Sequence, residues 1–383
     1  PIVCQTTINE DAQLVKSTGG DYDAFGWATS YHGGRALIGA IYEDSGAYNG
    51  GAAILFELNN GSWTQVAKFV ASAPGDLFGV SVSIYDTKAL VGSSLDDDKG
   101  AQSGSAYMFE RQSGGTWSQV AKFVPSDGAG GDEFGVSVSL YETRALVGAY
   151  KDDDKGSSSG SAYVFERQNN GGWTQAAKLV AADGAADDQF GIAVSLYETR
   201  ALVGARYDDD KGTNSGSVYV FERLSNGSWA QATKIVASDG TGWRSFGNLV
   251  SLDGDRALVG GNGHVYVLDR LSDGTGWTET TKLSLSTNVN EFGTAFALSG
   301  NKAVVGAWAD NTEAYQAGSA HVFELLSNGS WIYSAKLLST NIAQEDKLGM
   351  SVSIYGNTVL VGAPGDNDNG LKSGSAFLFN LGD

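Results

Sequence analysis

A short acidic motif recurs along the 383-residue chain, and its residue types suit a hard cation. The motif is Asp-Asp-Asp-Lys-Gly at residues 96–100, 152–156 and 208–212, and Asp-Asn-Asp-Asn-Gly at 366–370. Two carboxylates at this spacing, with a backbone carbonyl, can converge on one calcium ion, and the glycine permits a sharp turn. The candidate metal ligands are therefore Asp96, Asp98, Asp152, Asp154, Asp208, Asp210, Asp366 and Asp368.

A second interpretation of this motif needs no metal. Aspartates cap turns through their side-chain oxygens, and an acidic loop surface keeps a protein soluble. An EF-hand loop is longer than this motif and ends in a bidentate glutamate, which is missing here. The corresponding loops with Glu43 and Ser45, and with Asp310 and Thr312, are degenerate copies.

The elements that position these loops repeat with the same period. Phe-Gly pairs begin at residues 25, 78, 134, 190, 246 and 292, and a Leu-Gly pair begins at 348, with spacings of 53, 56, 56, 56, 46 and 56 residues. Within one unit, four strands are expected at 134–141, 144–149, 161–167 and 173–180. Four antiparallel strands per repeat are typical of a propeller blade. The sequence predicts an all-β, seven-bladed β-propeller that forms a single domain over residues 1–383.

The two ends of the chain complement each other. The last unit stops after its third strand, at residues 375–381, and no outer strand follows. Residues 12–15, Ala-Gln-Leu-Val, precede Phe25 as the outer strand of unit 3 precedes Phe190, which makes Gln13 the equivalent of Lys178. We therefore expect residues 1–20 to supply the outer strand of blade 7 and to close the ring.

The Phe-Gly pairs, Val-Gly-Ala-Pro at 361–364 and Gly-Ser-Ala-Phe-Leu-Phe at 374–379 resemble the FG-GAP repeat of integrin α-subunit propellers and their prokaryotic and algal relatives. The resemblance covers the whole chain and implies the propeller fold. That family carries a calcium loop of the form DxDxDGxxD between the first and second strands. Here this position holds only Tyr-Glu-Thr-Arg at 141–144, so calcium binding at the family's usual position is not carried over.

The Asp motifs and the connections between blades are expected on one face of the disc. Blade 5 is 10 residues short there, with nine missing between Gly260 and Tyr266, which predicts a notch in this face. Aromatic faces stack on sugar or peptide C–H groups while acids hold hydroxyls or cations. The candidate ligand-binding residues are Trp27, Trp243 beside the notch, Trp308 and Asp310, with local packing as the alternative role for the tryptophans.

Two further series belong to the turns and strands. Asn60, Asn226 and Asn328 each begin an Asn-Gly-Ser triplet, which is an N-glycosylation acceptor in a secretory pathway and also a good hairpin turn. A basic residue after the first turn (Arg144 in unit 3), a lysine in the outer strand (Lys178) and a glutamate in the third strand (Glu166) recur in the units. Repetition of this kind predicts pairing between strands.

Composition excludes several classes of function. The net charge of −19 and the pI of about 4.5 disfavour nucleic acid and anionic membranes as partners. No apolar run approaches the roughly 20 residues of a membrane span. Pro1 in place of Met suggests a processed product, and the single cysteine, Cys4, excludes an internal disulfide. His32, His264 and His321 lie in different units without metal-ligand spacing, and no catalytic motif is present, so no enzymatic activity is expected.

The sequence therefore predicts an extracellular or cell-surface adhesion propeller that is not an enzyme. It would bind a glycan or a protein partner through its acidic loop face, with assistance from Ca²⁺. Two alternatives stay open at this point. One is a subunit that assembles with itself into an extracellular filament or surface layer, and the other is a multivalent lectin with one site per blade.

Overall fold

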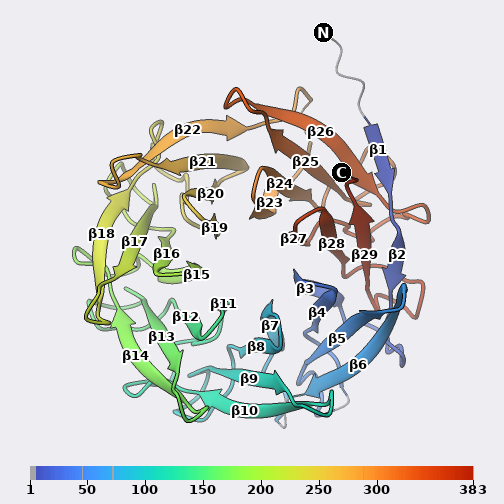
Figure 1. Ribbon diagram of the computed structural model, residues 1–383, viewed down its shortest axis with the longest axis horizontal. Coiled ribbons are helices and arrows are strands. Elements are labelled where there is room, and N and C mark those ends of the chain that lie inside the picture. The colour runs from blue at the N-terminus through green and yellow to red at the C-terminus, as the bar shows by residue number, and fades with distance from the viewer. Residues whose placement is uncertain (1–5, 45, 71–72, 288, 383) are drawn as a thin grey trace.

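The computed structural model describes residues 6–44, 46–70, 73–287 and 289–382. In these residues the chain forms seven β-sheets arranged in a ring, with the first strand of each sheet nearest the central axis (Figure 1). The described residues contain no α-helix, and consequently no helix that could cross a membrane. The predicted seven-bladed propeller is thus confirmed.

Each blade is an antiparallel sheet in which strands follow one another from the axis outward. The strands are β3 (Phe25–His32), β4 (Arg35–Ala40), β5 (Ala52–Asn59) and β6 (Ser62–Val70) in blade 1; β7 (Phe78–Tyr85), β8 (Lys88–Ser93), β9 (Ser105–Arg111) and β10 (Trp117–Phe123) in blade 2; β11 (Ser137–Tyr141), β12 (Arg144–Ala149), β13 (Ser161–Arg167) and β14 (Trp173–Leu179) in blade 3; β15 (Phe190–Tyr197), β16 (Arg200–Ala205), β17 (Ser217–Arg223) and β18 (Trp229–Ile235) in blade 4. They continue with β19 (Val250–Asp253), β20 (Arg256–Gly261), β21 (His264–Arg270) and β22 (Trp277–Leu283) in blade 5; β23 (Phe292–Ser299), β24 (Lys302–Ala307), β25 (Ser319–Leu325) and β26 (Trp331–Leu338) in blade 6; and β27 (Ser351–Tyr355), β28 (Thr358–Ala363) and β29 (Ser375–Asn380) in blade 7.

The N-terminal segment completes blade 7. Strand β2 (Ala12–Leu14) pairs antiparallel with β29, and Gln13 lies opposite Phe377 just as Lys178 lies opposite Tyr163 in blade 3. The predicted closure and its register are therefore confirmed. The structure adds one strand that the sequence pattern did not predict: β1 (Thr6–Asn9) runs parallel to β26 and extends blade 6 to five strands. Cys4 lies outside the described residues.

Adjacent blades meet through paired glycines. A Cβ atom added to Gly148 of β12 would lie 1.9 Å from the carbonyl oxygen of Gly191, the glycine of the next Phe-Gly pair. The same contact closes the ring, because a Cβ on Gly362 would lie 2.0 Å from the carbonyl oxygen of Gly26. Real Cβ atoms do not approach an oxygen so closely, so both motif glycines are needed for the backbones to meet.

The hydrophobic core lies between neighbouring blades. Phe134, which is fully buried, packs edge-on against Tyr163 and Phe165 of its own blade, with ring centroids 5.5 and 6.0 Å apart. The same cluster includes Leu90 and Met108 of blade 2. Because each second strand is covered by a blade on both sides, nearly all of its residues are apolar and buried, as in Ala145–Ala149 of β12.

The recurring charges pair both within and between blades. Arg144 binds Glu166 across β12 and β13 at 3.3 Å, which confirms the predicted pairing of these two series. Glu110 of blade 2 receives Arg167 of blade 3 at 2.7 Å and the indole N–H of Trp173 at 3.1 Å. These contacts tie the outer parts of consecutive blades together. The outer-strand lysines pair instead with aspartates of the acidic loops, as described below.

Candidate functional site on the loop face

The Asp motifs and the connections between blades do share one face, as predicted. The connection after blade 3 lies against the Asp loop of the same blade, since the amides of Asp187 and Gln189 donate to the carbonyls of Ser157 and Ser158 at 2.7 and 3.0 Å. The surface formed by the β4–β5 type loops and by the connections between blades is called the loop face below.

Each position of the Asp motif has a separate role in folding the loop. In blade 3, buried Asp152 accepts a hydrogen bond from the amide of Asp154, and Asp153 accepts one from the amide of Ser158. Gly156 has a φ of 131°, a conformation that favours glycine. In blade 7, Asn367 replaces the middle aspartate and accepts the amide of Lys372 in the same way. The middle residue is therefore a turn cap.

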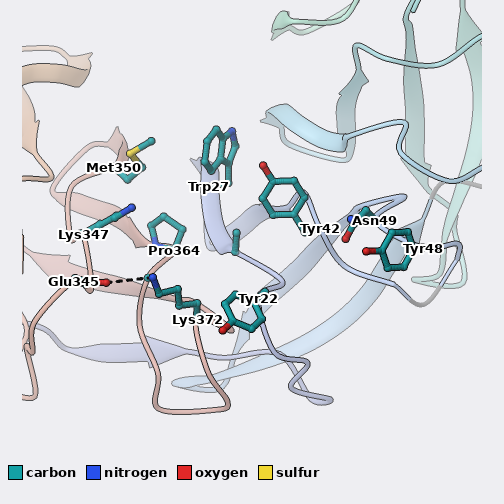
Figure 2. Close-up of a pocket in the computed structure, with 12 residues that line it drawn as sticks. Tyr22, Trp27, Tyr42, Tyr48, Asn49, Glu345, Lys347, Met350, Pro364 and Lys372 are labelled. Carbon is teal, nitrogen blue, oxygen red and sulfur yellow. Dashed lines mark hydrogen bonds and ion pairs between the residues drawn. The ribbon is translucent and has the colours of Figure 1, made fainter. Parts of the chain in front are cut away.

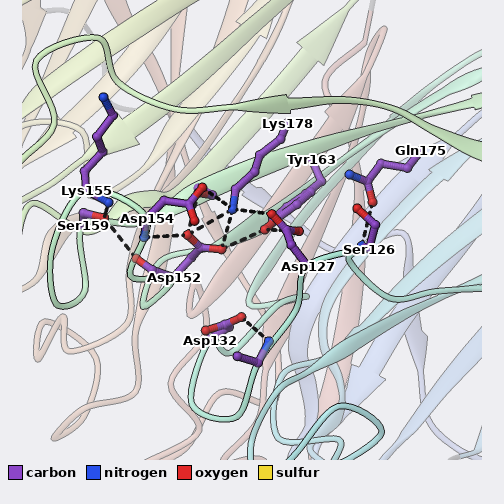
Figure 3. A network of polar contacts seen from close by, with 12 residues as sticks. Ser126, Asp127, Asp132, Asp152, Asp154, Lys155, Ser159, Tyr163, Gln175 and Lys178 are labelled. Atoms are coloured by element: carbon purple, nitrogen blue, oxygen red, sulfur yellow. Dashed lines mark hydrogen bonds and ion pairs between the residues drawn. The ribbon is translucent and has the colours of Figure 1, made fainter.

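A lysine ammonium lies among the carboxylates of the motif (Figure 3). Lys178 Nζ is 3.0 Å from Asp152, 2.5 Å from Asp154 and 2.7 Å from Asp127 of the preceding connection. Burial opposes its positive charge, but the hydrogen bonds that the ammonium donates to these three carboxylates raise the pKa of Lys178 above its usual value. The lysine expected to pair across strands thus serves as a cation held by the loop.

Blades 2 and 4 repeat this arrangement. Lys122 Nζ lies 2.9 and 2.5 Å from Asp96 and Asp98, and Lys234 Nζ lies 2.7, 2.7 and 2.6 Å from Asp183, Asp208 and Asp210. The carboxylate oxygens of the last three are within 4.8 Å of one another, as in a cation site. A calcium ion bound there would have to displace the ammonium group. The residues of blades 2–4 therefore do not fit Ca²⁺ while the lysine is in place.

Blade 7 has no lysine at this position because the N-terminal strand supplies Gln13 instead. The Gln13 side-chain amide donates to Asp368 at 2.8 Å and to Ser375 at 3.1 Å. Within the described residues, neither Asp366 nor Asp368 forms an ion pair. Burial, together with the nearby charge of Asp368, raises the pKa of Asp366. Blade 7 is thus the one Asp motif whose two carboxylates have no built-in cation among the described residues.

A second series of buried aspartates lies beneath the loops and was not singled out from the sequence. Asp346, only 4% exposed, accepts a backbone hydrogen bond from Ala343 at 2.5 Å. Burial, with Asp366 adding to it, raises the pKa of Asp346 to about 6. Asp76 and Asp188 occupy the equivalent place in their blades, and burial raises the pKa of each to about 6 as well. The position two residues before the Phe-Gly pair is the signal that identifies this series.

An aromatic pocket of about 490 Å³ lies on the loop face between blades 7 and 1 (Figure 2). Blade 1 supplies Trp27 and three exposed tyrosines, and blade 7 supplies Met350, Pro364 and charged side chains. The tyrosines are Tyr22, Tyr42 and Tyr48, which are 56%, 42% and 74% exposed. Glu345 and Lys372 form an ion pair of 3.2 Å on the opposite wall. Trp27, predicted as a ligand-binding residue, is therefore part of a hollow surface.

The other predicted ligand-binding residues have different surroundings. The Lys347 ammonium lies over the ring of Trp308, with its Nζ 5.4 Å from the ring centroid. Lys347 itself lines the aromatic pocket. Asp310 is buried and bound to Ser319 and Lys336, so it supports the blade 6 loop. Trp243 is 67% exposed at the entry to blade 5 and does not line the pocket. The pocket thus includes Trp27 and, through Lys347, lies next to Trp308. Trp243 and Asp310 are not part of it.

Three tyrosines of the aromatic pocket were missed from the sequence, although a signal was available. Trp27 lies outside the outer-strand position at which tryptophan recurs in the units, and by the same rule Tyr22, Tyr42 and Tyr48 stand out, because their positions are not aromatic in most units. The equivalents of Tyr22 in blades 2, 3 and 4 are Gly75, Gly131 and Asp187. Applied to tyrosine as well as tryptophan, the rule would have located the pocket.

The shortened loop of blade 5 leaves a hollow, as expected. Strands β20 and β21 are joined by Asn262 and Gly263 alone, and a polar cavity of about 740 Å³ lies between this turn and the connection to blade 6. The side-chain Nδ2 of Asn262 donates to the carbonyl of Trp243 at 3.2 Å, which places Trp243 at the edge of the notch.

The three candidate glycosylation residues lie at exposed turns between the third and fourth strands. These residues are Asn60, Asn226 and Asn328. The Asn226 side chain accepts hydrogen bonds from the amide and hydroxyl of Ser228, and Asn328 accepts the amide of Ser330. Both thus stabilise their turns, and glycan attachment stays a prediction.

Comparison with known proteins defines the class to which this propeller belongs. The sequence profile of the FG-GAP repeat matches seven segments, at residues 8–56, 63–109, 117–165, 173–221, 229–267, 277–323 and 331–379. These segments cover most of the chain, which therefore belongs to the FG-GAP repeat family. A search of curated proteins found no match. Among solved structures, Saccharomyces cerevisiae Sqt1 is similar over 99% of this chain and 100% of that chain, with a TM-score of 0.52 and 11% identity. At this identity the similarity concerns the fold alone.

Proposed function

We propose that this protein is a non-catalytic binding propeller that recognises a carbohydrate through the aromatic pocket of its loop face. The observation that supports this is the gathering of Trp27, Tyr22, Tyr42 and Tyr48 around one hollow. Aromatic faces pack on the C–H surface of a sugar ring, and the Glu345–Lys372 pair opposite them offers an acceptor and a donor for its hydroxyls. A glycan borne by a protein partner would use the same contacts.

Calcium enters the proposal only at blade 7. Asp366 and Asp368 have the oxygen ligands that calcium takes, and Gln13 adds an amide oxygen if its side chain turns over. Calcium there would neutralise the charge of Asp366 and hold the loop that carries Pro364 and Gly365 at the pocket wall. In blades 2–4 the lysines supply the corresponding positive charge.

The proposed location is extracellular or at a cell surface. FG-GAP repeats are typical of extracellular proteins, and the seven matching segments make that the natural setting for this chain. The alternative of a multivalent lectin has less support, because the Asp loops of blades 2–4 are occupied by their own lysines. The alternative of a self-assembling filament or surface-layer subunit rests on no particular contact of the described residues.

The test is a glycan array with the wild-type protein, followed by calorimetric titration of the best binder. Replacing Trp27 or Tyr48 by alanine should weaken binding at least tenfold, because each removes a stacking face. Trp243→Ala is the matched control, since it removes an exposed aromatic outside the pocket and should change affinity less than twofold. Equal losses in all three variants, or no binder on the array, would overturn the proposal.

The calcium component has its own readout. Titration of Ca²⁺ into the protein should give a single binding event that disappears in Asp366→Asn and persists in Asp152→Asn. Binding that is lost in Asp152→Asn but kept in Asp366→Asn would place calcium in blade 3 and refute its assignment to blade 7.

A further inference from the structure

An incomplete collar of aromatic rings surrounds the axis on the face opposite the aromatic pocket. It is formed by the last residue of the innermost strand in five blades. The rings follow in the order Tyr355, His32, Tyr85, Tyr141 and Tyr197, with neighbouring centroids 4.2, 4.5, 5.0 and 4.9 Å apart. The planes of neighbouring rings are tilted by 32–50° relative to each other. In blades 5 and 6 the equivalent residues are Asp253 and Ser299, so the collar has a gap of two positions.

The gap is flanked by two rings that each stack on one neighbour only. Among the aromatic contacts of the described residues, Tyr197 packs on Tyr141 and Tyr355 packs on His32. Each of these end rings therefore lacks the second neighbour that every inner ring of the collar has. A cavity of about 420 Å³ opens at this place, lined by Tyr197, Asp253 and residues of the blade 5 turn. The gap is therefore an open slot beside an aromatic face.

Most of the charged side chains that line this slot are already paired with one another. Asp255 pairs with Arg200 at 3.0 Å and with Arg270 at 3.8 Å, and Asp269 pairs with Arg256 at 2.6 Å. Asp253 has no ion pair among the described residues; its Oδ2 accepts the amide of Gly300 at 2.5 Å, which leaves Oδ1 for another donor. The collar adds no positive charge, because burial lowers the pKa of His32 and keeps its imidazole neutral near pH 7.

We propose that the slot beside Tyr197 and Asp253 binds an arginine side chain presented by a protein partner. The flat guanidinium would continue the stack on Tyr197, through a cation–π contact, and donate to Asp253. A charge-assisted hydrogen bond beside an aromatic face is stronger and more selective than either contact alone. This site lies on the opposite face from the aromatic pocket, so it is independent of carbohydrate binding.

The probe is a short Gly/Ser peptide with one central arginine, compared with the same peptide containing citrulline, which has the same shape but no charge. The protein is labelled with ¹³C in its tyrosine rings, and the signal of Tyr197 is assigned with Tyr197→Phe. Titration with the arginine peptide should shift this signal before those of the other tyrosines, and the citrulline peptide should bind at least tenfold more weakly.

Two variants and one control complete the test. Asp253→Asn should weaken the arginine peptide at least tenfold, and Ser299→Tyr, which fills the gap, should do the same without removing a charge. Glu142→Gln removes one exposed charge from the same face in the middle of the collar and should change affinity less than threefold. Equal affinity for the two peptides, equal effects of Asp253→Asn and Glu142→Gln, or shifts spread over all tyrosines would each overturn the proposal.

Discussion

Removing the Lys178 ammonium tests whether the loop carries its own cation. In Lys178→Met the stem remains beside Tyr163, but three carboxylates lose their shared positive partner. Asp127 and Asp154 are 45% and 49% exposed, so water compensates most of their loss, at about 0–1 kcal/mol each. Asp152 is 5% exposed, and removing the partner of a buried ion costs about 3–5 kcal/mol.

Asp152 keeps its hydrogen bonds from Tyr163 and Ser161, at 2.8 and 3.0 Å, which favours the lower end of that range. We therefore expect a loss of about 3 kcal/mol. With an unfolding entropy of about 2.1 cal/mol/K per residue over 383 residues, the Tm should fall by about 4 °C. Calorimetry in the presence of a chelator measures this value.

Two further measurements make the reasoning refutable. Lys178→Met/Asp152→Asn should recover most of the lost stability, because the amide keeps the contact with Tyr163 without an unpaired charge. Calcium should raise the Tm of Lys178→Met more than that of the wild type, because the variant has a vacant set of carboxylates in blade 3 in addition to the proposed site in blade 7. An unchanged Tm in Lys178→Met, or no recovery in the double variant, would show that the ammonium is not the cation of this loop.

Three other changes address the blade contacts and the buried titratable groups. Gly148→Ala should cost about 3 kcal/mol in urea unfolding, because its Cβ would overlap the Gly191 carbonyl, whereas Gly114→Ala, with nothing within 4 Å, should cost less than about 0.5 kcal/mol. Asp346→Asn should be more stable than the wild type at pH 7.5 and lose this advantage near pH 5. The folded pKa of about 6 lies above the unfolded value, so the wild type regains stability as pH falls through 6; thermal melting with a chelator present checks it. Burial lowers the pKa of His321 to about 4. As the pH falls from 6.5 to 4, this histidine is therefore protonated in the unfolded chain before it is protonated in the folded one, and the wild type loses stability. His321→Tyr, which introduces the tyrosine found at this position in blades 3 and 4, should abolish that loss in the same thermal melts.

The fold could be predicted because every unit repeats the same local sequence signals for turns and strands. Glycines and polar pairs set the turns, and alternation within the first strand places its apolar side against the next blade. The N-terminal closure followed from register, as Gln13 and Lys178 are equivalent. Strand β1 could not be foreseen in this way, since Thr6–Asn9 has no counterpart in any other unit.

The candidate site was harder to predict from the sequence, because its contacts depend on how the blades are placed around the ring. The lysines were visible as a series, but a bulge between the third and fourth strands, at Val164 and Phe165 in blade 3, helps to decide which way Lys178 reaches. The tyrosine collar was hidden for a similar reason. Consecutive members from His32 to Tyr197 lie 53 or 56 residues apart in sequence, and only the closed ring brings their side chains into contact.

The joining of β2 to β29 also sets an order of events during synthesis. The Gln13 side chain donates a hydrogen bond to Asp368, 355 positions further along the chain, so this contact must wait until synthesis has passed Asp368 and that residue has left the ribosome. Until then blade 7 lacks its outer strand and β29 has an open edge, which is a place where another chain could pair. Strand β2 is thus made long before it can join its blade, and the interval until it joins is a period in which this propeller is exposed to aggregation.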